Sequence, residues 1–114
     1  MDRNALRSEA PPARVVEHVP FDARRVAEAP ASPGVFVLYR QHRLIYIGLA
    51  GTGATIRQRL QRHLRGEGGA CTHGATEFDY ETSAYPRWLY RHYLAVYLEV
   101  SGGLLPECNT ADDR

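Results

Sequence analysis

Side chains that could bind a negatively charged group gather in one part of this sequence. Residues 29–66 contain six arginines and no aspartate or glutamate, whereas the whole chain has a net charge of only +1. Codon usage that favours arginine would explain why the chain has no lysine. It would not explain why aspartate and glutamate are absent from residues 29–66. Arg59 and His63 are four residues apart, so on a helix they lie side by side. Arginine holds phosphate oxygens with a planar fork of donors, and these residues therefore predict a phosphate-binding surface.

Periodic patterns predict the elements that would position these side chains. Val35–Tyr39 and Leu44–Gly48 are rich in β-branched and aromatic residues and flank a short polar segment, which predicts an antiparallel hairpin. Thr55 is the expected N-cap of a helix over Ile56–Arg65, whose apolar residues recur at every fourth position. The glycine-rich segment between hairpin and helix leaves space for a ligand to approach the backbone.

Further elements complete an α+β domain. The alternation in Glu77–Thr82 predicts a third strand, and a second long helix is expected from Pro86 until Ser101. Asp22 can cap a short helix over Ala23–Glu28 ahead of the hairpin. The order β-β-α-β-α predicts a small three-stranded, mainly antiparallel sheet flanked by helices.

The 114 residues are too few for two independent cores, so one domain is expected. We expect residues 1–29 to form an N-terminal arm with its short helix, 30–110 to form the domain, and 111–114 to be an acidic tail.

Neither a secretory signal nor a membrane-spanning run is recognisable. Cys71 and Cys108 are too few for a disulfide framework, and the expected location is cytoplasmic. Zinc is not favoured, because Cys71 and His73 supply only half of a paired ligand motif.

An ordered set of short motifs resembles the GIY-YIG nuclease domain. The motifs are Pro33–Tyr39, Tyr46–Gly48, the helix residues Arg59 and His63, and Pro106–Asn109. They span roughly residues 30–110 and follow the order of the predicted elements. The resemblance implies metal-assisted hydrolysis of a DNA phosphodiester, a reaction that needs an activated water and stabilisation of developing negative charge.

The resemblance also implies roles for individual residues. Tyr46 and His63 would handle the attacking water, Arg59 would contact the scissile phosphate, and Asn109 would brace the site. Gly34 and Gly48 would be structural glycines. Mg²⁺ or Mn²⁺ would be the cofactor, with ligands that the sequence does not identify. Additional substrate contacts are expected from three further arginines of the acid-free stretch, namely Arg57, Arg62 and Arg65.

Two positions depart from the family pattern. Phe36 stands where the first motif has a tyrosine, and Tyr39 is a poor substitute because it points to the opposite face of an ideal strand. The metal-binding glutamate of the family falls near Tyr90, which has no carboxylate. The other carboxylates considered as metal ligands are Glu77, Glu81 and Glu99.

Three functions follow from these observations. The leading expectation is a divalent-metal-dependent endonuclease acting on DNA. The alternative is a catalytically inactive domain of the same fold that binds DNA or RNA through its arginines. A protein-interaction domain, using the acidic residues 67–114, is the third; it would show no affinity for nucleic acid even at low salt. No membrane partner is expected.

Overall fold

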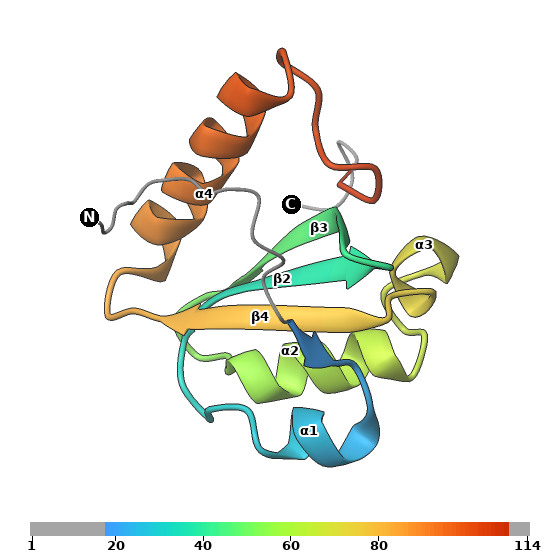
Figure 1. The fold of residues 1–114 in the computed structure, drawn as a ribbon. Coiled ribbons are helices and arrows are strands. Elements are labelled where there is room, and N and C mark those ends of the chain that lie inside the picture. Colours follow the sequence, from blue (N-terminus) through green and yellow to red (C-terminus); the bar gives the residue numbers. More distant parts are fainter. Residues whose placement is uncertain (1–17, 110–114) are drawn as a thin grey trace, which may run out of the picture.

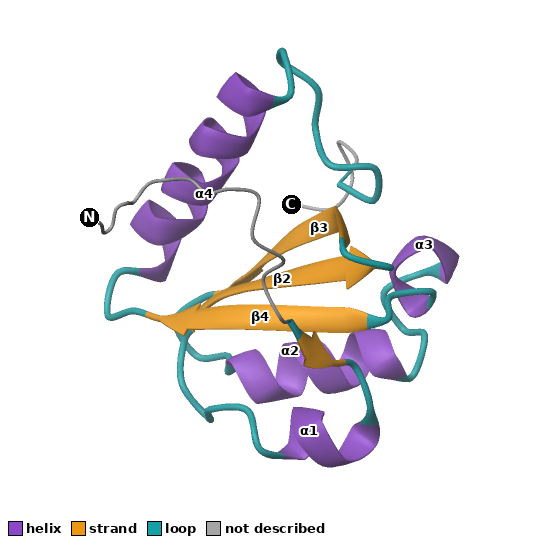
Figure 2. Cartoon of the chain, viewed as in Figure 1, coloured by secondary structure: helices purple, strands orange, loops and turns teal. Residues whose placement is uncertain are grey.

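The computed structural model describes residues 18–109. Its elements, in chain order, are β1 (Val19–Pro20), α1 (Ala23–Ala27), β2 (Gly34–Arg40), β3 (Arg43–Ala50), α2 (Ile56–Leu64), α3 (Ala70–His73), β4 (Glu77–Thr82) and α4 (Pro86–Val100). Figure 1 shows one antiparallel sheet with α1 and α2 on one face and α4 on the other. The same arrangement of helices and strands is coloured by type in Figure 2. This confirms the expected α+β class.

The sheet has four strands in the order β1-β4-β2-β3, so the expectation of three strands was incomplete. The added strand, β1, is only two residues long and pairs with β4. A segment this short carries no detectable alternation, which explains why its sequence gave no strand signal. Strand β3, which carries Tyr46, forms one edge of the sheet, so one of its sides has no neighbouring strand.

The predicted hairpin is present as β2 and β3. Gln41 and His42 form its two-residue turn, and both have positive φ, at 51° and 69°. The register shifts between Leu38 and Tyr39. Before this shift the side chains alternate between the two faces, so Phe36 packs toward α1 and α2 while Val35 and Val37 pack toward α4.

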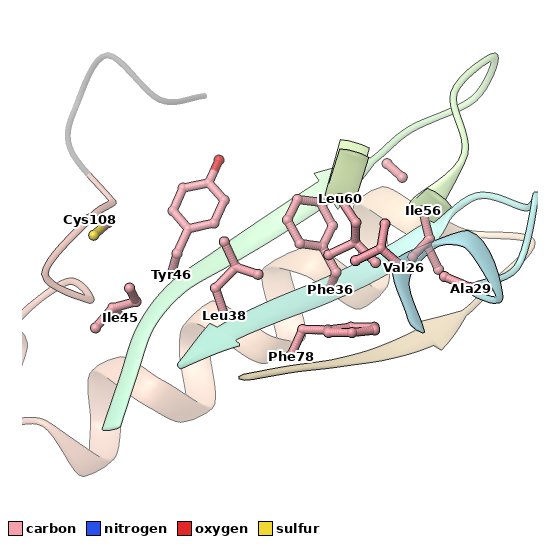
Figure 3. Close-up of a cluster of buried hydrophobic side chains, with 11 residues drawn as sticks. Val26, Ala29, Phe36, Leu38, Ile45, Tyr46, Ile56, Leu60, Phe78 and Cys108 are labelled. Atoms are coloured by element: carbon pink, nitrogen blue, oxygen red, sulfur yellow. The ribbon is translucent and has the colours of Figure 1, made fainter. Parts of the chain in front are cut away.

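The two faces of the sheet bury separate apolar clusters. Phe36, Leu38 and Phe78 from the strands meet Ile56 and Leu60 of α2 in the larger cluster, which Figure 3 shows in close-up. The predicted helical stripe is therefore confirmed as the buried face of α2. Helix α1 adds Val26 to the same cluster, and the segment after this helix adds Ala29, so both belong to the domain core.

Local signals at the helix starts are also confirmed. The side chain of Asp22 accepts a hydrogen bond from the backbone of Arg25, and that of Thr55 accepts one from the backbone of Gln58. Such bonds satisfy backbone N–H groups that have no partner in the first helical turn. Helix α3 was not predicted, because four residues in a glycine-rich segment show no helical period.

Cys71 and Cys108 form a disulfide, with Cα atoms 5.7 Å apart, which the sequence did not predict. The bond joins α3 to the segment that follows α4. Disulfides persist mainly in oxidising compartments, so this bond gives no support to the cytoplasmic expectation.

Within residues 18–109, no helix has the length and apolar character needed to cross a membrane. Residues 1–17 and the expected acidic tail, 111–114, lie outside the described part of the chain.

Candidate functional site

A cavity of about 810 Å³ lies where α2, α4 and the edge strand β3 meet. Its lining combines cationic, aromatic and small side chains from three separate parts of the sequence. The lining residues are Phe36, Tyr46, Leu49, Gly51, Thr52, Ala54, Arg59, His63, Arg87, Tyr90, Arg91 and Leu94. The structure thus brings Tyr46, Arg59 and His63 together. It adds four residues of α4, of which Arg87 and Arg91 are cations that the sequence did not assign to a site.

Tyr46 lies in β3 at the border of the larger core cluster. Only 9% of its surface is exposed, and its ring centre lies 5.0 Å from that of His63 and 6.0 Å from that of Phe36. Figure 3 shows its hydroxyl group pointing away from Leu38. Packing therefore holds the ring in place, and Tyr46 is one of the residues that line the cavity.

Phe36 stands where the motif resemblance would place a tyrosine, and its ring lies against Gly48 of the neighbouring strand. A Cβ atom on Gly48 would overlap the Phe36 ring. A Cβ atom on Gly34 would collide with the backbone of Glu81. Close packing therefore leaves no room for a side chain at either glycine. Tyr39 packs on the α4 face instead, where burial and the neighbouring Asp79 raise its pKa, so it contributes no hydroxyl to the cavity.

Arg59 extends from α2 into the cavity and carries an unsatisfied polar atom. Its Nε is buried and has no hydrogen-bond partner within residues 18–109. A buried donor without an acceptor costs free energy, more so when the group is charged. An anionic ligand in the cavity would supply the missing acceptor.

His63 is fixed by contacts that the sequence did not reveal. It is only 8% exposed, and its Nδ1 lies 2.8 Å from the hydroxyl oxygen of Thr72 in α3. Gly68 leaves room for the imidazole, because a Cβ atom there would overlap Nδ1 of His63. Neither Thr72 nor Gly68 belongs to a motif, so only the folded chain identifies them as supports of the site.

Helix α4 contributes Arg87, Tyr90 and Arg91 to the cavity. Leu89 of the same helix packs on the sheet, which turns the two arginines to the opposite side, where both are exposed. The sequence could have indicated this pair, because Arg87 and Arg91 are four residues apart and therefore lie on one face of a helix. Tyr90, at the position where the resemblance would place a metal-binding glutamate, lines the cavity and has no carboxylate.

Asn109 does not line the cavity but holds the strand that carries Tyr46. Its amide group accepts a hydrogen bond from the backbone N–H of Ile47 at 2.8 Å and donates one to the carbonyl of Ile47 at 3.0 Å. The residue is buried, with 6% of its surface exposed. Asn109 therefore fixes the end of the described chain to β3, next to Tyr46.

The three arginines expected to contact substrate do not line the main cavity, although Arg62 lines a smaller adjoining cavity of about 250 Å³ together with Arg59 and His63. Arg57 donates from Nε to the carbonyl of Ala29 and so ties α2 to the segment after α1. Arg62 and Arg65 border a shallow cavity of about 370 Å³ along α2, and both lie near Glu67. The hydrogen bond from Arg65 lowers the pKa of Glu67, so these charges are largely satisfied within the protein.

The donor set of the main cavity does not fit Mg²⁺ or Mn²⁺. These cations prefer carboxylate oxygens, whereas the cavity presents three guanidinium groups and no Asp or Glu among its lining residues. Glu67 lines a smaller adjoining cavity, but Arg65 already occupies its oxygens. No cluster of three His, Cys, Asp or Glu side chains suited to a metal occurs between residues 18 and 109.

The other carboxylates considered as metal ligands lie elsewhere. Glu77 accepts a hydrogen bond from the backbone of His42 near the hairpin turn. Glu81 accepts one from the hydroxyl of Tyr93 on the α4 face, where burial and this carboxylate raise the pKa of Tyr93 to about 12. Glu99 is exposed on α4, outside the cavity lining.

Comparison of the chain with protein-family models, curated proteins and solved structures gave no match. The GIY-YIG resemblance therefore stays a prediction based on motif order. The geometry of the cavity is the remaining guide to function, and its main property is a concentration of positive charge beside two buried aromatic side chains.

Proposed function

We propose that this chain is a nucleic-acid-binding domain whose cavity holds a phosphodiester group of DNA. The observation that supports this most is the Nε of Arg59, which is buried and has no hydrogen-bond partner within residues 18–109, in a main cavity with no carboxylate among its described lining residues. A phosphodiester oxygen is a strong, charged acceptor that arginine engages through two parallel N–H groups. The binding function, rather than metal-dependent cleavage, is the one that the donor set favours.

Binding can be measured by the fluorescence anisotropy of labelled duplex DNA over a range of salt concentrations. Wild-type protein is expected to bind with an affinity that falls steeply with salt, because phosphate contacts release counterions. We expect Arg59→Gln to weaken binding by about tenfold or more, since a hydrogen bond to a charged group contributes about 1.5–3 kcal/mol. Arg59→Lys should recover only part of this loss, because lysine keeps the charge but lacks the planar fork.

Arg24→Gln is the matched control. Arg24 lies exposed on α1 beside Glu28 and does not line the cavity, so this variant removes the same charge from another place. Equal weakening by Arg59→Gln and Arg24→Gln would show that only the net charge matters, and would contradict the proposed site. Absence of salt-sensitive binding to both DNA and RNA would favour the protein-interaction alternative.

Phosphodiester hydrolysis is a second candidate, favoured by one observation. Tyr46 and His63, two side chains able to exchange a proton with water, border the same cavity as Arg59. We propose cleavage assays on the same DNA with Mg²⁺, with Mn²⁺ and with EDTA. Cleavage that Tyr46→Phe and Arg59→Gln both abolish would support hydrolysis, and intact DNA under every condition would leave binding as the function.

A further inference from the structure

The arginines of this domain divide sharply by their partners. Between residues 18 and 109, most arginines lie within 4.0 Å of a carboxylate or donate to a backbone carbonyl. These are Arg24, Arg25, Arg40, Arg43, Arg57, Arg62 and Arg65. The three others, Arg59, Arg87 and Arg91, have no such partner in this part of the chain, and all three line the same cavity.

The position of Arg87 and Arg91 is not explained by the stability of α4. Arg87 lies in the first turn of this helix, where the backbone dipole favours acidic side chains and disfavours cations. Neither guanidinium packs into the apolar cluster around Leu89, and both are exposed. Three cations at one cavity, without a carboxylate partner between residues 18 and 109, also repel one another, so an anionic ligand would relieve the repulsion.

From this convergence we propose that Arg87 and Arg91 form, with Arg59, a clamp for phosphoryl oxygens that needs no divalent cation. The inference rests on the proposed function and specifies how the ligand is held. Two elements contribute from different sides, α2 through Arg59 and α4 through the other two arginines. Guanidinium groups supply the positive charge that a metal ion supplies in cation-dependent phosphate sites. A divalent cation would instead be repelled by three neighbouring positive charges.

The first test compares DNA affinity in EDTA with affinity in Mg²⁺ at matched ionic strength, again by anisotropy. Binding in EDTA is expected to be at least as tight as in Mg²⁺, because the cation only competes for the phosphates. Loss of binding in EDTA that Mg²⁺ restores would overturn the proposed clamp.

The second test uses the double variant Arg87→Gln/Arg91→Gln, with Arg24→Gln/Arg43→Gln as a control of equal charge loss. The control arginines are exposed and do not line the cavity. The α4 double variant is expected to weaken DNA binding in EDTA by about tenfold or more beyond the control. Because both α4 arginines are solvent-exposed, the circular dichroism spectrum should stay that of the wild type.

The outcomes separate this inference from the proposed function. If Arg59→Gln weakens binding but the α4 double variant behaves like its control, the clamp is wrong while the DNA-binding site at Arg59 stands. If the wild-type protein shows no salt-sensitive affinity for DNA, the proposed function fails and the clamp fails with it. Weakening by both sets of variants in EDTA supports both.

Discussion

At the residue scale, the candidate site combines side chains that the sequence identified with others that it did not. Arg59 and His63 were predicted as neighbours because a helix places residues four apart on one side. Tyr46 required the family resemblance to single it out, since tyrosine in a strand is common. Thr72, Arg87 and Arg91 were missed, because their link to Tyr46 exists only through contacts between distant segments.

Gly48 provides a prediction about packing at this scale. We expect Gly48→Ala to lower the free energy of unfolding by about 1–3 kcal/mol, because the new methyl group would overlap the Phe36 ring in the core. The measurement is urea unfolding followed by circular dichroism. Gly51→Ala is the control, since its Cβ atom would meet only Leu49 Cγ, at 4.0 Å. Equal stability of the two variants would contradict the assigned contact.

At the scale of elements, the long periodic segments were predictable and the short ones were not. Helix α2 and strands β2 and β3 have enough residues to show their repeat, and caps such as Thr55 mark where a helix begins. Strand β1 and helix α3 have two and four residues, fewer than their periods need. These short elements are nevertheless important, because α3 carries Thr72 and thereby fixes His63.

The hairpin turn allows a stabilising substitution. Gln41 and His42 both have positive φ, which two-residue hairpin turns require and which asparagine and glycine adopt more readily. We expect Gln41→Asn/His42→Gly to raise the free energy of unfolding by about 1 kcal/mol, measured by urea unfolding. His92→Gly, at an exposed position of α4, should instead destabilise by about 1 kcal/mol. A destabilised turn variant would show that the native turn is not strained.

At the scale of the whole molecule, the segment after α4 returns to the sheet and closes the structure. The backbone of Cys108 donates a hydrogen bond to the carbonyl of Ile45, and Asn109 pairs with Ile47. The disulfide then joins this segment to α3 across 37 residues of sequence. The edge strand β3, with Tyr46 between these two contacts, is thus held from outside the sheet.

The disulfide leads to a prediction about global stability. Opening a closed loop of this length gives the unfolded chain more freedom, so Cys71→Ser/Cys108→Ser is expected to lower the free energy of unfolding by about 2–4 kcal/mol. Urea unfolding of the wild-type protein with and without a thiol reductant measures the same effect. The double variant should not respond to the reductant. A wild-type urea midpoint that is identical in both conditions would contradict the stabilising role.

The sequence by itself determined the α+β class, the hairpin, the buried stripe of α2 and the placement of Arg59 and His63 on the same side of this helix. These features depend on contacts between residues near in sequence, where helical and strand periods and capping side chains act directly. Only the tertiary structure decided that α4 brings Arg87 and Arg91 to the same cavity, that Thr72 holds His63, and that Cys71 meets Cys108. Those contacts depend on how the helices pack on the two faces of the sheet, which is set by the burial of apolar surface across the whole chain.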